Sequence, residues 1–150
     1  MHMQTVILGL GNELLGDEGV GVHAIRLLIK EKLPRPVKLV EVGTAILDAL
    51  PEFEQADHII ILDAVQHGGV PGTVYKIPLG HCTRPTNIAS MHGFDIFRVL
   101  ALAERRETPS VMVLGVEPEL LQWSLQLSSQ VEASLPHLVA AVRSELLEAP

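Results

Sequence analysis

Short apolar runs rich in β-branched residues recur along the chain, and each has the length of a β-strand. They lie at Thr5–Leu10, Val37–Val42, Ile59–Val65 and Ser110–Val116. Nearly every position in these runs is apolar, which is typical of strands that are covered on both faces. The pattern therefore predicts the core strands of an α/β sheet.

Segments with helical spacing separate these runs. Val22, Ile25 and Ile29 share one face of a predicted helix, and a second helix is predicted over Gly93–Arg106. A third begins at Ser129, which forms a capping-box pattern with Glu132. Its apolar stripe continues to Leu146, and Pro136 lies close enough to the start that at most a kink is expected.

A further strand is predicted at Thr73–Ile77, after the turn sequence Gly68–Gly72. It follows Val65 too closely for a crossover helix, and a parallel return needs about a dozen residues or more. This fourth strand should run antiparallel to the third, so the sheet is mixed. In open sheets of this kind, sites lie outside the carboxyl ends of the parallel strands.

The composition fits one globular domain over residues 1–150, with 47% hydrophobic residues and a net charge of −7. An acidic chain with 3% aromatic residues is a poor partner for nucleic acid. The single cysteine, Cys82, excludes an intramolecular disulfide. Since no apolar run has the length of a signal-peptide core or a membrane span, we expect a cytoplasmic protein with no membrane partner.

The glycine-rich segment Gly9–Gly21 follows the first strand and precedes a helix, as nucleotide-binding loops do. However, Leu14 occupies a position that a dinucleotide fingerprint gives to glycine. Asp17 and Glu18 place two carboxylates where a phosphate would lie on the helix N-terminus. Nucleotide binding is therefore the minor alternative, and Asp17 is expected to cap the helix and complement its dipole.

Glu18, Asp63 and His92 are expected to meet at the carboxyl edge of the sheet. Asp63 lies near the end of a buried strand, where a carboxylate needs a partner or a ligand. His92 precedes a helix that must start at the same edge, and a helix N-terminus favours the neutral imidazole. Hydrogen bonds to loop amides would also account for these polar groups, and that alternative stays open.

Two carboxylates and one imidazole suit a borderline divalent metal with open coordination positions. Ligand type alone does not separate nickel, zinc, manganese and cadmium. The other histidines lie on polar helix faces, before a strand or in loops. Cys82 has His81 beside it, but neighbouring side chains on an extended chain point apart, so a cysteine nucleophile is a minor alternative.

Several motifs together resemble the hydrogenase maturation endopeptidases, over nearly the whole chain. In order, they are Gly9-Leu10-Gly11-Asn12, Leu15-Gly16-Asp17-Glu18-Gly19-Val20-Gly21, Ile61-Leu62-Asp63-Ala64, Met91-His92-Gly93, Gly115-Val116-Glu117-Pro118-Glu119 and the Leu135-Pro136 helix. The resemblance implies a three-layer α/β/α sandwich of the phosphorylase/hydrolase-like type, with a five-stranded mixed sheet whose fourth strand is antiparallel. One departure is Glu41-Val42-Gly43-Thr44, where many relatives carry Asp-Gly-Gly-Thr.

The resemblance implies an endopeptidase that removes a C-terminal extension from the large-subunit precursor of a [NiFe] hydrogenase after nickel insertion. The family's nickel-recognising residues fall on Glu18, Asp63 and His92, so the metal is expected to arrive with the substrate, and no organic cofactor is expected. The residues identify no nucleophile, which leaves a water activated by the metal or by a carboxylate. The alternative is a non-catalytic metal- or nucleotide-binding α/β module.

Overall fold

The computed structural model describes residues 3–80, 91–105 and 107–148. It contains a five-stranded sheet with the strand order β2-β1-β3-β5-β4. The strands are β1 (Thr5–Leu10), β2 (Lys38–Gly43), β3 (His58–Ala64), β4 (Val74–Gly80) and β5 (Ser110–Val116). Neighbouring strands are parallel except β4, which pairs antiparallel with β5. The prediction of a mixed sheet with an antiparallel fourth strand is confirmed.

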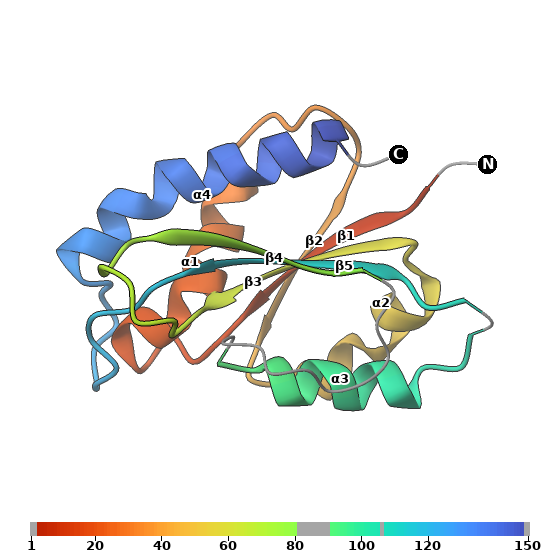
Figure 1. The fold of residues 1–150 in the computed structure, drawn as a ribbon, viewed down its shortest axis with the longest axis horizontal. Helices are drawn as coiled ribbons and strands as arrows, with labels where there is room; N and C mark the ends of the chain where they lie inside the picture. The colour runs from red at the N-terminus through yellow and green to blue at the C-terminus, as the bar shows by residue number, and fades with distance from the viewer. Residues whose placement is uncertain (1–2, 81–90, 106, 149–150) are drawn as a thin grey trace.

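Helices cover both faces of this sheet (Figure 1). They are η1 (Gly16–Gly19), α1 (Val20–Leu28), η2 (Ile46–Ala49), α2 (Leu50–Gln55), α3 (Gly93–Leu102) and α4 (Ser129–Glu148). The pair α1 and α4 packs on one face around Ile25, Leu62 and Val142, while α2 and α3 pack on the other around Phe53 and Ile61. The α/β/α sandwich is therefore confirmed, and β3 is buried at every position, as its apolar sequence predicts.

The fourth strand extends beyond its predicted end at Ile77 and includes Pro78 and Gly80. Proline is tolerated here because β4 lies at the edge of the sheet, and the pairing register shifts between Pro78 and Gly80. Residues 81–90, which include His81 and Cys82, lie outside the described residues.

Two helix ends also differ from prediction. The helix α3 ends at Leu102 instead of Arg106, because Ala103 adopts an extended conformation. At the start of α4, the N-cap is Ser128 and not Ser129: the Ser128 hydroxyl accepts a hydrogen bond from Val131 N–H at 3.4 Å. The helix then continues through Pro136, as expected.

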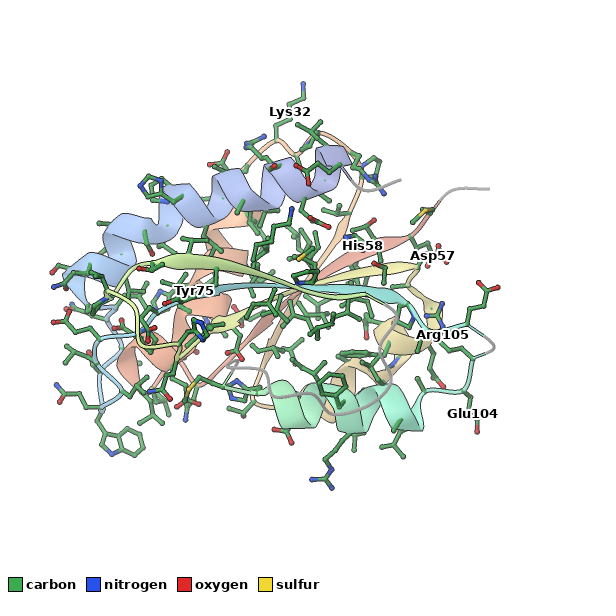
Figure 2. The ribbon with its side chains drawn as sticks, in the orientation of Figure 1. Lys32, Asp57, His58, Tyr75, Glu104 and Arg105 are labelled. Carbon is green, nitrogen blue, oxygen red and sulfur yellow. The ribbon has the colours of Figure 1, made fainter. Side chains whose placement is uncertain are left out.

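Different polar side chains lie at the two ends of the sheet. Figure 2 shows Tyr75 toward one end, and Asp57, His58 and Arg105 toward the other. At the latter end, the Arg105 guanidinium donates to the carbonyl oxygens of Phe53 and Ala56.

Within the described part of the chain, no helix has the length and apolar character needed to cross a membrane.

Candidate active site

Glu18, Asp63 and His92 come together at the carboxyl edge of the parallel strands. Glu18 lies in η1, directly after β1 and its loop, Asp63 is the penultimate residue of β3, and His92 immediately precedes α3. The His92 imidazole lies between the two carboxylates: its Nδ1 is 3.0 Å from Asp63 Oδ1 and its Nε2 is 3.4 Å from Glu18 Oε1. The predicted convergence is therefore present in the structure.

Asp63 is a fully buried carboxylate with a dense set of hydrogen bonds. Its Oδ1 accepts from the N–H of Ala64 at 2.9 Å, and its Oδ2 accepts from the N–H of His92 at 3.0 Å. The contact with His92 Nδ1 involves both oxygens. Asp63 thus fixes both the backbone and the ring of His92 relative to β3, in the way that a carboxylate orients a metal-ligating histidine.

The pKa of His92 is shifted in the direction opposite to the one expected from the helix N-terminus. Burial lowers the pKa of the imidazole, but the hydrogen bond to Asp63 and the charges of Asp63, Glu18 and Asp95 outweigh it, and the net pKa is raised. The helix N-terminus has the opposite effect, but nearby carboxylates dominate. Because a metal binds the unprotonated imidazole nitrogen, metal binding at His92 competes with a proton.

The carboxylates and the imidazole do not form a ready-made metal cage. In the described ranges, 3–80, 91–105 and 107–148, no group of three His, Cys, Asp or Glu side chains is arranged to hold a metal ion. His92 Nε2 and Glu18 Oε1, 3.4 Å apart, have about the separation of two ligands of a tetrahedral ion with bonds near 2.1 Å. At this spacing, Glu18 and His92 could hold two positions of an ion and would leave its other positions open.

Asp17 lies in the first turn of η1, where a carboxylate complements the helix dipole, but it does not cap a helix as predicted. Neither η1 nor α1 is capped by a side chain. Instead, the fully buried Asp17 carboxylate accepts hydrogen bonds from Glu119 N–H, Leu120 N–H and both the N–H and hydroxyl of Ser128, at 2.7–2.9 Å. It fastens the segment after β5 to the loop that carries Glu18.

Close backbone packing accounts for glycines of the Gly9–Gly21 segment. A Cβ on Gly21 would collide with the carbonyl oxygens of Leu62 and Leu10, so glycine lets α1 lie directly on β1 and β3. Gly11 has a φ of +117°, a conformation that side chains rarely adopt, and its N–H donates to Gly43 O at 2.9 Å. The glycine pattern is thus explained without a nucleotide.

The departure at Glu41-Val42-Gly43-Thr44 places a longer carboxylate beside the glycine loop. Glu41 accepts from Arg26 Nε at 2.7 Å, and Arg26 also binds Glu13 at 2.7 Å. Glu41 is therefore engaged in an exposed ion-pair network with Arg26. Thr44 lines two hollows: one of about 280 Å³ beside the glycine-rich segment, and one of about 320 Å³ that extends along α3 past Asp95. Neither is lined by Glu18, Asp63 or His92.

A second polar cluster at this end of the sheet was not predicted. Glu117 is buried, and its Oε1 accepts from the N–H of His67 and Gly69 and from the Tyr75 hydroxyl at 2.8–2.9 Å. Burial opposes its ionisation, but these hydrogen bonds outweigh burial and lower the pKa of Glu117. The cluster fixes the turn between β3 and β4. The available sequence signal was a carboxylate directly after a buried strand.

The fold and the site together define an α/β enzyme with two carboxylates and an imidazole at the carboxyl edge of its sheet. The model of the hydrogenase maturation protease family matches residues 22–145. The hydrogenase 2 maturation protease of Escherichia coli K12 is 35% identical, with 98% of this chain and 95% of that protein covered.

Solved structures agree with this relationship. The hydrogenase maturating endopeptidase HybD from E. coli superposes with a TM-score of 0.84 and 32% identity, over 98% of this chain and 94% of that one. The [NiFe] hydrogenase maturation protease HybD from Thermococcus kodakarensis gives 0.77 and 28% identity, over 95% and 98%. The chain belongs to the hydrogenase maturation protease family and is an endopeptidase.

Proposed function

We propose that this endopeptidase removes the C-terminal extension of a nickel-loaded [NiFe] hydrogenase large-subunit precursor, and that it recognises the nickel through Glu18, Asp63 and His92. The observation that carries the proposal is the line Glu18, His92, Asp63 at the carboxyl edge of the sheet. The names of the relatives, which are maturation proteases of hydrogenases, support the substrate.

Nickel is part of the substrate in this proposal. The three side chains do not enclose a site of their own, which supports a metal already held by ligands of the precursor. Glu18 and His92 would hold the nickel, which would compete with the proton that the neighbouring carboxylates favour on the imidazole. The metal would place one peptide bond at the site, so the main catalytic contribution is proximity.

Hydrolysis requires a water to attack the peptide carbonyl carbon and a proton to reach the leaving amine as the C–N bond breaks. Asp63 is fully buried and engaged in hydrogen bonds, whereas the Glu18 side chain is 16% exposed. Glu18 is therefore the carboxylate of the pair that water can reach. We assign the activation of water to nickel or to Glu18, with Asp63 as the positioning residue for His92.

The test is cleavage of nickel-loaded and nickel-free precursor, read as the loss of mass at the C-terminus. Only the loaded form should be cut, and Glu18→Gln, Asp63→Asn and His92→Leu should each reduce the rate about 100-fold or more. Glu13→Gln is the matched control, because Glu13 is an exposed carboxylate in the same glycine-rich segment, and should retain activity. Thermal unfolding of each variant separates loss of chemistry from loss of fold. Equal cleavage of both precursor forms would refute nickel recognition.

A further inference from the structure

An exposed apolar surface lies beside the site and is not used by the chemistry. Trp123 is 77% exposed, Leu125 is 66% exposed and Leu14 is 47% exposed. Leu120 and Leu121 are also exposed, and these five residues are called here the Trp123 surface. No charged residue occurs between Glu119 and Glu132, although the chain has a net charge of −7.

Backbone contacts make this surface continuous. Leu15 forms a parallel β-bridge with Ser124, and Ser124 N–H donates to Leu14 O at 2.9 Å. Leu14 is thereby placed next to the segment that carries Trp123 and Leu125. Those two residues directly flank Ser124 in the chain, and both are exposed.

The loop that carries the Trp123 surface is fixed in place. Asp17 holds it at Glu119, Leu120 and Ser128, and within the loop the Ser124 hydroxyl donates to Gln126 O and accepts from Gln126 N–H. Leaving a tryptophan and several leucines in water costs hydrophobic free energy that folding normally recovers. A fixed loop that keeps such side chains exposed is pre-organised for binding, because little conformational freedom remains to be lost.

The surface is directly connected to the site. Asp17 N–H donates to Leu120 O at 2.8 Å, and Glu18 is the next residue. A protein whose peptide bond reaches Glu18 therefore passes next to the Trp123 surface. A second copy of this chain bound to the Trp123 surface would cover the neighbouring site at Glu18. The enzyme's protein substrate is therefore the occupant that fits both the apolar surface and the site beside it.

We propose that the Trp123 surface docks the large-subunit precursor through an apolar patch of that protein, outside the cleaved segment. The inference rests on the proposed function for the identity of the partner. Tryptophan-centred apolar contacts dominate many protein interfaces, and interface cores are depleted of charge. Docking through this surface is independent of nickel, so it precedes and does not require metal recognition.

The test uses the fact that Trp123 is the only tryptophan. Protein labelled with 5-fluorotryptophan gives a single ¹⁹F resonance, and unlabelled nickel-free precursor is added to it. The resonance should shift and broaden at saturating precursor. In a parallel binding titration without the label, Trp123→Gln should raise the Kd about 30-fold, corresponding to an interface hot spot. In cleavage of the nickel-loaded precursor, the same variant should raise KM with little change in kcat.

Leu147→Gln is the matched control, because Leu147 is 73% exposed at the opposite end of α4, a 20-residue helix about 30 Å long. Its Kd should equal that of the unmodified protein. An unchanged Kd for Trp123→Gln, an equal loss for Leu147→Gln, or a ¹⁹F shift produced by raising the enzyme concentration alone would each overturn the proposal. Cleavage without nickel, combined with Trp123-dependent binding, would refute only the nickel recognition. An enzyme that neither binds nor cleaves the precursor would refute the proposed function and this inference together.

Discussion

The buried Asp17 carboxylate should be among the most sensitive positions in the protein. It is 0% exposed and accepts four hydrogen bonds, three from backbone N–H groups and one from the Ser128 hydroxyl. Asp17→Ala removes every acceptor at once. The freed donors differ in whether water can replace the carboxylate. Glu119 and Leu120 are exposed, so their N–H groups can bond to water, whereas Ser128 is buried and its donors cannot.

The expected loss of unfolding free energy follows from this difference between the exposed and the buried donors. A buried N–H without an acceptor costs about 1–3 kcal/mol, and each lost hydrogen bond to a charged group costs about 1.5–3 kcal/mol before water compensates. With compensation at two of the four partners, Asp17→Ala should lower the free energy of unfolding by about 4 kcal/mol. Asp17→Asn keeps one acceptor oxygen for the three partners of Oδ2 and loses only the Ser128 N–H, so about 2 kcal/mol is expected.

Urea unfolding at neutral pH measures both variants. With a slope of about 2 kcal/mol per molar, the midpoint should fall by about 2 M for Asp17→Ala and about 1 M for Asp17→Asn. Ser128→Ala completes a double-mutant cycle, in which the double variant should lose less than the two single losses added together. If Asp17→Ala unfolds within about 0.5 kcal/mol of the parent, as an ordinary surface change does, the reasoning about the loop anchor is wrong.

Three further variants test other parts of the fold. Glu117→Gln should destabilise the protein most near neutral pH. Because folding lowers the pKa of Glu117, the ionised carboxylate stabilises the fold above the usual carboxyl pKa, and this stabilisation is lost as the pH falls through the lowered pKa. Urea midpoints of parent and variant at pH 7 and pH 3 measure this, and a difference that does not depend on pH would contradict it. Gly21→Ala should cost about 3 kcal/mol or more, since the added Cβ meets rigid backbone of β1 and β3, and a melting temperature equal to the parent's would exclude that packing. Pro136→Ala should raise the free energy of unfolding by about 1–3 kcal/mol, because alanine restores the backbone N–H donor that proline lacks at this exposed position inside α4. Thermal unfolding followed by circular dichroism would show the gain. A loss of stability would indicate that the proline ring packs favourably.

Long, strongly patterned elements were predictable from the sequence, and short ones were not. The apolar run of β3 and the spacing of α4 determine their own conformations. By contrast, α2 has six residues with Pro51 in its first turn, too few for a periodic pattern, and its single fully buried side chain, Phe53, gives no periodicity. The choice between Ser128 and Ser129 as N-cap depended on Asp17, 111 residues away, which no local pattern contains.

The location of the three site residues was predictable from the sequence, but the pKa shift of His92 was not. Parallel strand direction was enough to bring Glu18, Asp63 and His92 to one edge. The direction of the His92 pKa shift was not predictable, because it depends on contacts of 3.0–3.4 Å with two carboxylates, which outweigh the effect of the helix end. Their metal-binding role stays a prediction.

The Asp17 contacts also determine when during folding the site can form. The partners of Asp17 lie 102–111 residues further along the chain. Closing loops of this length has an entropic cost, and contacts of such high sequence separation form late. During synthesis, the glycine-rich segment with Glu18 leaves the ribosome long before the residues that fix it. The enzyme should therefore be unable to engage a precursor until residues 119–128 have been made and have bound Asp17.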